Sequence, residues 1–200
     1  MQADIKSYLY DIAPASVYHM THIDNLEGIF SKGLLAHNNN FKKVDISNKN
    51  VNNYREKLEP IYNRSIHSYV PFYFNPRNAM LYSVQKRFSS SVVLLEFSNE
   101  LLLKSNAVFT NGNASRRDTD FSNNIYFLND FNWNLVFSTS WSGLGDHVKT
   151  AMMSEVLIYQ RQGLESLIKF NCQSKSVARM LNNRFNTNLF VSNPSLFFSI

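Results

Sequence analysis

The sequence predicts a single domain of the α+β class. Several short runs rich in β-branched and aromatic residues predict strands, while few segments have the spacing of an amphipathic helix. The chain has 200 residues, of which 44% are hydrophobic, enough for one core but too few for two independent ones. Several strands with few helices are typical of mixed α+β domains.

The first element is a short strand at 17–18, followed by a helix over the stretch THIDNLEGIFSKG. Thr21 or Asp24 is suited to cap this helix, and Gly33 to end it. The residues expected on its apolar face are Leu26, Ile29 and Phe30. Residues 37–68 follow, rich in Asn and Lys, and predict a long surface loop with one helical turn at 54–58. Loops of this length often cover a functional site.

The second half supplies most of the strands. Residues 92–97 predict a buried central strand, and 155–159 another. Asn111-Gly112 predicts a tight turn with positive φ. The remaining expectations are a strand within GLESLIKFNC, a helix within SKSVARMLNNRF with Val177, Met180 and Leu181 on one face, and a terminal strand within NLFVSNPSLFF.

Composition excludes several classes of function. The single cysteine, Cys172, allows neither an internal disulfide nor a thiolate metal cluster. No apolar run approaches the roughly 20 residues that span a bilayer, and the N-terminus lacks the pattern of a signal peptide, so a cytoplasmic protein without membrane contact is expected. The net charge of +5 permits a polyanionic partner. Common nucleotide, metalloprotease and hydrolase motifs are absent from the sequence.

Five residues are candidates for chemistry. His19 and His22 stand close to Asp24, but this spacing offers no clear third metal ligand, so capping and packing roles are favoured and no metal is expected. Glu155 begins an apolar strand, where a carboxylate is either exposed at the strand end or used at a cleft. Arg55 is either a solvated side chain or a clamp for a pyrophosphate or base.

Several stretches, in order along nearly the whole chain, resemble the DarT-type DNA ADP-ribosyltransferase toxins. They are YHMTHIDNLEGIFSKGLLAHN, YVPFYFNPRNAMLY, VVLLEFS, VFTNGNAS, AMMSEVLIY and VSNPSLFF. The resemblance implies an ADP-ribosyltransferase-like fold over 1–200, with central mixed or antiparallel sheets split around an NAD cleft and flanking helices. It also implies a loop at about 40–56 that covers NAD and one at about 109–155 that reads the substrate.

The resemblance also implies the site residues. Glu155 and Arg55 would be catalytic, with Glu155 holding the ribose and stabilising an oxocarbenium-like transition state. NAD would be bound by residues that include the H-x-T element: His19, Met20, Thr21, Gly28, Leu35 and Arg55. Arg116 and Arg117 would contact DNA phosphates. Two residues before Glu155 stands Met153, where many other ADP-ribosyltransferases carry a polar residue.

The implied function is a toxin that uses NAD+, without a metal, to mono-ADP-ribosylate a base in single-stranded DNA and releases nicotinamide. Its implied partner is a DarG-type macrodomain antitoxin. Thymine and guanine both remain open as the acceptor base. Two alternatives also remain: an enzyme that modifies RNA or acts as an RNA 2'-phosphotransferase, and a non-catalytic nucleic-acid-binding module.

Overall fold

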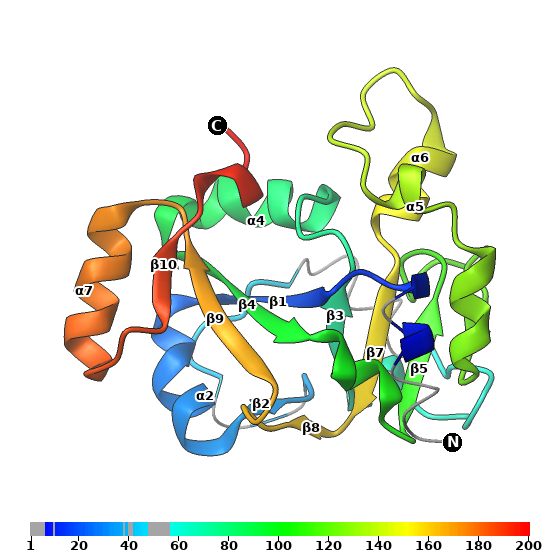
Figure 1. The fold of residues 1–200 in the computed structure, drawn as a ribbon, viewed down its shortest axis with the longest axis horizontal. Coiled ribbons are helices and arrows are strands. Elements are labelled where there is room, and N and C mark those ends of the chain that lie inside the picture. The colour runs from blue at the N-terminus through cyan, green and yellow to red at the C-terminus, as the bar shows by residue number, and fades with distance from the viewer. Residues whose placement is uncertain (1–6, 10, 38, 40–41, 48–56) are drawn as a thin grey trace.

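The computed structural model describes residues 7–9, 11–37, 39, 42–47 and 57–200. Its centre is an eight-stranded sheet of order β10-β9-β4-β1-β3-β7-β5-β6, accompanied by the two-stranded sheet β2-β8 (Figure 1). The strands are β1 Ser16–His22, β2 Leu34–Leu35, β3 Tyr69–Tyr73, β4 Val92–Ser98, β5 Ala107–Thr110, β6 Phe121–Ser122, β7 Glu155–Tyr159, β8 Arg161–Gln162, β9 Leu167–Cys172 and β10 Phe190–Ser192. The α-helices are α2 Leu26–Lys32, α4 Ala79–Phe88, α5 Trp133–Val136, α6 Asp146–Met152 and α7 Lys175–Phe185.

The predicted fold class is confirmed. The paired strands of the described chain are antiparallel except for β9 and β10, which are parallel, so the sheet is mixed. Six 3-10 helices complete the described elements: Ile23–Asn25, Ile66–Ser68, Ser89–Ser91, Asn99–Leu103, Ile125–Asp130 and Pro194–Leu196. No described helix has the length and apolar character needed to cross a membrane.

The large sheet is split between β1 and β3. Within the described chain these strands pair only where Tyr18 faces Tyr73, whereas β1 pairs with β4 along its whole length. In Figure 1, β1 and β4 run across the picture while β3 and β7 run steeply. Pro71 occupies the middle of β3 on the edge that faces the split, where its missing N–H leaves no donor for β1. The sheet therefore opens beside this residue.

The chain before α2 differs from the prediction. The strand predicted at 17–18 extends to His22, so Thr21 lies within β1 and does not cap a helix. A 3-10 turn follows, in which the His22 side chain accepts the backbone N–H of Asp24, and α2 starts only at Leu26. The β-branched residues of β1 and its full pairing with β4 favour the longer strand. Gly33 ends α2 with φ +76°, as predicted.

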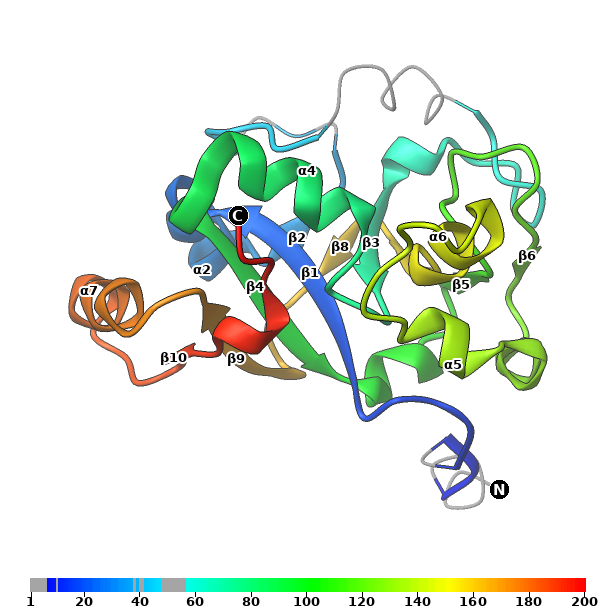
Figure 2. The ribbon, with the colours of Figure 1, turned by 90° about the horizontal axis from the view of Figure 1, so that it is seen from above.

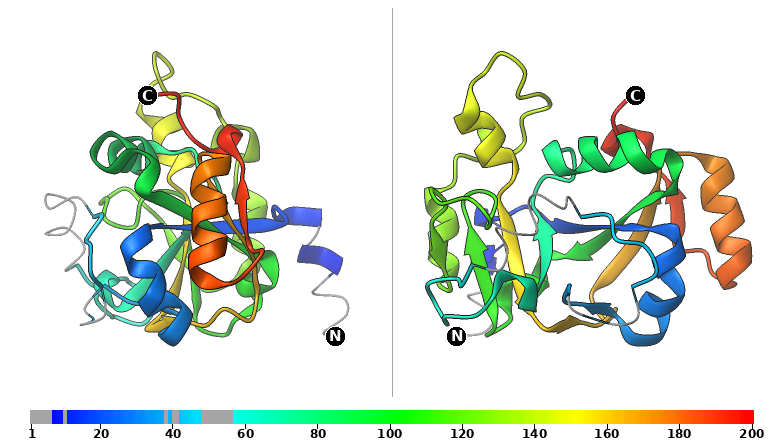
Figure 3. Two further views of the ribbon diagram at one scale, coloured as in Figure 1. Left: turned by 90° about the vertical axis from the view of Figure 1, so that its left-hand side faces the viewer. Right: turned by 180° about the vertical axis from the view of Figure 1, so that it is seen from behind.

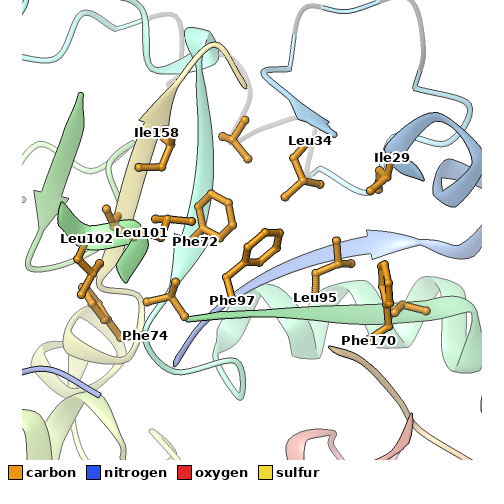
Figure 4. Packing of buried hydrophobic residues seen from close by; sticks show 14 of the residues in the cluster. Ile29, Leu34, Phe72, Phe74, Leu95, Phe97, Leu101, Leu102, Ile158 and Phe170 are labelled. Carbon is orange, nitrogen blue, oxygen red and sulfur yellow. The ribbon is translucent and has the colours of Figure 1, made fainter. Parts of the chain in front are cut away.

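Hydrophobic residues pack on both faces of the sheet. Figure 4 shows the larger cluster. In it, the rings of Phe72 of β3 and Phe97 of β4 meet edge to face, with their centroids 5.2 Å apart. On the other face, under α4, a smaller cluster joins residues of β1, β3, β4 and the C-terminal segment: Met20, Tyr73, Leu81, Val84, Val92, Leu94, Met153 and Phe197. Figure 2 looks onto α4 above this second cluster.

The remaining predicted elements are mostly observed. β4 and β7 lie within the sheet at the predicted positions, and β9 forms within GLESLIKFNC. The C-terminal stretch was predicted as one strand, but β10 ends at Ser192 and a 3-10 helix begins at Pro194. Proline has no N–H group to donate to the hydrogen bonds between strands, so the strand does not continue through it. Asn111 and Gly112 were predicted to have positive φ, which is wrong for both.

Helix α7 packs at the outer end of the sheet, beside β10 (Figure 3). Leu181 and Ala178 are buried and Val177 is half-buried against the core. Met180, predicted on the same face, is 48% exposed. The buried stripe follows positions three and four apart, and Met180 lies outside it.

Candidate active site

A cavity of about 470 Å³ lies where β1 and β3 separate. Alternate residues of β3, Tyr69, Pro71 and Tyr73, form one part of its wall. The five described residues predicted to bind the cofactor all line it: His19, Met20 and Thr21 from β1, Gly28 from α2 and Leu35 from β2. Segments far apart in the sequence are thus brought to one cavity.

His19 bridges the split in the sheet. Its Nδ1 lies 2.8 Å from the carbonyl oxygen of Pro71, and because a carbonyl only accepts, Nδ1 carries the proton. The ring also contacts Phe72 at 5.7 Å between centroids. These contacts fix the orientation of the imidazole at the cavity wall.

Asn25 connects β1 to the described part of the predicted NAD-covering loop. Its Oδ1 accepts the backbone N–H groups of Lys43 and Val44, both at 2.9 Å. Its Nδ2 donates to the carbonyl of Val44 at 2.8 Å and to the hydroxyl of Thr21 at 3.2 Å. A further anchor comes from the Arg87 guanidinium, which donates to the carbonyls of Ile46 and Ser47. The segment 42–47 is therefore tied to the cavity wall at both ends.

Glu155 is fully buried at the first position of β7. It faces Tyr73 on β3 and Thr110 on β5, so its side chain shares a face of the sheet with a wall residue. Its Oε1 accepts the backbone N–H of Ala114 at 2.7 Å. Glu155 is not itself a wall residue, but Ala114, to which it is bonded, lies in the sequence between the two wall residues Asn113 and Ser115.

The segment predicted to read the substrate also reaches the cavity. Arg116 lines it, and its guanidinium forms two hydrogen bonds with Asp118 at 2.8 and 2.7 Å. These bonds lower the pKa of Asp118 to about 2. Arg117 is exposed and does not line the cavity. Met153, two residues before Glu155, is buried and forms part of the wall.

Arg55, the other predicted catalytic residue, lies outside the described residues. So does most of the predicted covering loop at 40–56, of which only 42–47 belong to the described chain. The helical turn predicted at 54–58 is described only at its end, where Leu58 forms a β-bridge with Ser65. The loop predicted at 109–155 contains β6, α5 and α6.

A polar group on the cavity wall was not predicted from the sequence. The rings of His37 and His67 lie 4.6 Å apart, and Lys42 Nζ lies 3.3 Å from His37 Nδ1. Lys42 also donates to Asp45 at 2.9 Å. Burial raises the pKa of Asp45, but hydrogen bonds from Ser47 and Lys42 outweigh it and lower the pKa to about 2. In the sequence, His37 and His67 stand near the two ends of the long loop predicted at 37–68, and this is the pattern that could have indicated the group.

The histidines near the N-terminus do not form a metal site with Asp24. Residues three apart on a strand point to opposite faces, so His19 turns toward Pro71 while His22 packs edge to face on Phe88 of α4 at 5.2 Å. Throughout the described chain, no group of three His, Cys, Asp or Glu side chains has a geometry that could hold a metal ion.

Comparison with known families identifies the family of this chain. The family model described as "ssDNA thymidine ADP-ribosyltransferase, DarT" matches residues 18–197. The chain belongs to the DarT family. The DarT match runs from β1 to the C-terminal segment and therefore includes the cavity wall and Glu155.

Individual DarT relatives support this assignment. A DNA ADP-ribosyl transferase of Thermus sp. (strain 2.9) is 28% identical over 159 residues, which cover 74% of this chain and 76% of the relative. A transferase–glycohydrolase fusion protein of Thermosipho africanus is 30% identical over 152 residues, 72% of this chain but 39% of the fusion. The chain thus spans less than half of the fusion protein.

Solved DarT structures have the same fold. The structure of Thermus sp. 2.9 DarT in complex with ADP-ribosylated ssDNA matches with a TM-score of 0.84 at 23% identity, covering 92% of this chain and 97% of that one. The same protein in complex with NAD+ matches with a TM-score of 0.79, also at 23% identity, covering 92% and 98%. At this level of identity, the matches show the shared fold.

Proposed function

We propose that this DarT chain transfers ADP-ribose from NAD+ to a thymine base in single-stranded DNA and releases nicotinamide. One observation carries the proposal: His19 and Thr21 line a cavity in the split sheet, and Glu155 is hydrogen-bonded to Ala114, which stands between two residues of the cavity wall. The family description names thymidine, which favours thymine over guanine as the acceptor. The relative from Thermus has been solved with both NAD+ and ADP-ribosylated ssDNA.

The cavity suits a dinucleotide. Its volume of about 470 Å³ lies in the range of small-molecule sites, and its wall contains both aromatic side chains and cations. The rings of Tyr69 and Tyr73 are proposed to contact the planar groups of NAD+. The part of the wall formed by Lys42, His37 and His67 is proposed to contact its phosphates. His19, Met20, Thr21, Gly28 and Leu35 are proposed to hold the remainder. When bound, NAD+ supplies the ADP-ribosyl group.

Glu155 is proposed as the catalytic carboxylate. Departure of nicotinamide leaves positive charge on the ribose, and a fixed negative charge stabilises it most effectively where water is excluded. Glu155 meets both conditions, because it is fully buried and the N–H of Ala114 holds its Oε1 in place. Arg55 is proposed to place the acceptor base or assist removal of its proton, on the basis of family resemblance alone.

DNA is proposed to approach from the side of the 109–155 segment. Arg116 and the exposed Lys149 both line the cavity there, where they are placed to contact phosphates. Arg117 is exposed next to Arg116 and is proposed to contact the phosphate backbone farther from the cavity. A single-stranded substrate fits, because chemistry on a base requires it to leave the stack.

The cellular role is proposed to be that of a bacterial toxin acting in the cytoplasm, where DNA is available. Its partner is proposed to be a DarG-type antitoxin that carries an ADP-ribose-removing macrodomain. The Thermosipho relative joins a DNA ADP-ribosyl transferase and a DNA ADP-ribosyl glycohydrolase in one chain, which supports such a pairing.

The test is mass spectrometry of a mixed-sequence single-stranded DNA oligonucleotide incubated with NAD+ and the protein, beside Glu155→Ala. We expect an ADP-ribose adduct on thymine with wild type only. An adduct on RNA alone would replace the DNA proposal with that of an RNA-modifying enzyme. Salt-sensitive DNA binding without turnover of NAD+ would indicate a non-catalytic binding module.

A further inference from the structure

An aromatic cluster lies beside the cavity, formed by Tyr82 of α4, Trp141 of the 138–145 loop and Phe198 near the C-terminus. Ring centroids lie 5.9 Å apart for Tyr82 and Trp141, 5.4 Å for Tyr82 and Phe198, and 5.9 Å for Trp141 and Phe198. All three contacts are edge-to-face, and each residue is half-buried. Part of each side chain thus remains accessible to solvent.

Two cations accompany these rings. Lys86 Nζ lies 4.5 Å from the centroid of Tyr82, and the Arg77 guanidinium lies 4.9 Å from that of Phe198. Lys86 is exposed. Sites that bind single-stranded nucleic acid commonly combine aromatic rings with positively charged side chains. The rings stack on the bases, and the positive charges contact the phosphates.

The cluster adjoins the cavity through both of its supporting elements. In α4, Met80 and Ser83 line the cavity, and Tyr82 stands between them in the sequence. The 138–145 loop leads into α6, where Lys149 lines the cavity. Figures 1 and 2 show α4 and the C-terminal end side by side, and in Figure 1 the loop arches beyond the sheet near the start of α4. The cluster thus lies on α4 and on the loop that leads into α6, two elements that also contribute residues to the cavity wall.

Hydrogen bonds anchor two of the segments that carry the cluster. The Gln85 side chain accepts the backbone N–H of Phe198 at 2.9 Å and donates to its carbonyl at 3.2 Å. Asn75 donates to the carbonyl of Ser138 at 3.2 Å, at the start of the loop that carries Trp141. A platform ordered before its ligand arrives loses less entropy when it binds.

We propose that a nucleotide next to the acceptor base stacks on Trp141 in this cluster, with Lys86 and Arg77 near its phosphates. The ligand is thus the flanking part of a single-stranded nucleic acid, and the proposal rests on the proposed function for the identity of that strand. Stacking is nearly independent of base type, so this contact increases affinity for the strand rather than reading its sequence.

The first experiment uses tryptophan fluorescence, since the chain has two tryptophans. Trp133→Phe leaves Trp141 as the reporter, and the matched control Trp141→Phe leaves Trp133, which packs against Phe74 at 5.3 Å. Each is titrated with a thymine-containing single-stranded oligonucleotide without NAD+. We expect quenching in Trp133→Phe and a clearly smaller change in Trp141→Phe. Equal responses would overturn the proposal.

The second experiment combines a variant with a modified ligand. Wild type and Trp141→Ala are each titrated with the intact oligonucleotide and with oligonucleotides that carry an abasic site on either side of the thymine. We expect about tenfold weaker binding for Trp141→Ala, about the same loss for wild type with one abasic position, and no further loss when both changes are combined.

The abasic ligands test the proposal on the unaltered protein, so a folding defect in Trp141→Ala does not remove the test. Wild-type affinity that is unchanged by either abasic position would overturn the proposal. These measurements need no transfer reaction. Quenching with no adduct would therefore contradict the proposed activity alone, and an adduct with no effect of abasic sites would contradict the platform alone.

Discussion

The Oε1 atom of Glu155 lies 2.7 Å from the backbone nitrogen of Ala114 and accepts its hydrogen bond. This contact joins the first residue of β7 to the segment between β5 and β6, and both residues are fully buried. The position of the proposed catalytic charge is therefore set by the same segment that reaches the cavity through Asn113 and Ser115.

Replacing Glu155 with glutamine separates the effect of its charge from the effect of its size and shape. Glu155→Gln keeps an oxygen that can accept from Ala114 but removes the negative charge, so we expect a loss of transfer rate on the order of a hundredfold or more, close to that of Glu155→Ala. The measurement is the single-turnover rate of DNA modification at saturating NAD+. Residual activity within about tenfold of wild type for Glu155→Gln would show that the charge is not what matters.

Asn25 is expected to order the segment at 42–47. Asn25→Ala leaves the N–H groups of Lys43 and Val44 without their acceptor, and we expect a loss of about 1–3 kcal/mol in the free energy of unfolding and weaker NAD+ binding. Calorimetric titration with NAD+ and denaturant unfolding measure both effects.

The matched control for Asn25 is Lys43→Ala, which removes only the exposed ion pair with Glu27 and keeps the backbone N–H. Its effect on unfolding is expected to be clearly smaller than that of Asn25→Ala, because solvent screens an exposed ion pair. If Asn25→Ala bound NAD+ as tightly as this control, segment 42–47 would have no part in the NAD+ site.

Alanine substitutions at two glycines compare the cost of backbone strain with the cost of a steric clash. Gly33 and Gly143 have nearly the same φ, +76° and +75°, but a Cβ on Gly33 would lie 2.6 Å from the carbonyl oxygen of Gln162, and one on Gly143 would meet nothing within 4 Å. Gly143→Ala is expected to cost about 1–2 kcal/mol from backbone strain alone. Gly33→Ala should cost clearly more, because the β2–β8 pair must also shift. Equal midpoints in denaturant unfolding would contradict the collision.

Cys172 is expected to be chemically inert in the folded protein. Burial raises the pKa of its thiol to about 12, so the reactive thiolate is scarce at pH 8. Alkylation by iodoacetamide should be at least about a hundredfold slower than in denaturant. Since the unfolded thiol ionises near pH 9, this residue contributes stability below pH 9 that declines as pH rises toward 12. Rapid labelling under native conditions would contradict this burial.

Strands were the part of the fold most accessible from sequence. β4 and β7 are continuous runs of β-branched and apolar residues because both faces of these strands are buried, and such runs need no knowledge of their neighbours. The end of β1 was harder to predict, because Thr21 and His22 are also suited to cap a helix. The strand extends through these residues because they pair with β4.

Long-range contacts limited what could be predicted about the site. The role of Gly112 was assigned to positive φ, yet its constraint is close packing, with a Cβ placed 2.7 Å from Thr150 Cγ2. The contact between the rings of His37 and His67 likewise depends on residues thirty positions apart meeting at the cavity. The residues predicted to bind the cofactor were available only through the family resemblance, of which the H-x-T element is one part, because their spacing in the sequence does not indicate a shared cavity.

Pro71 and His19 have a consequence for the behaviour of the sheet as a surface. Wherever two strands part, each exposes backbone groups that could recruit a foreign strand and seed self-association. Here the proline lacks the donor that an incoming strand would use, and the imidazole already occupies its carbonyl. These two residues, which lie where the sheet splits, thus make the inner edge of β3 a poor template for intermolecular β-pairing.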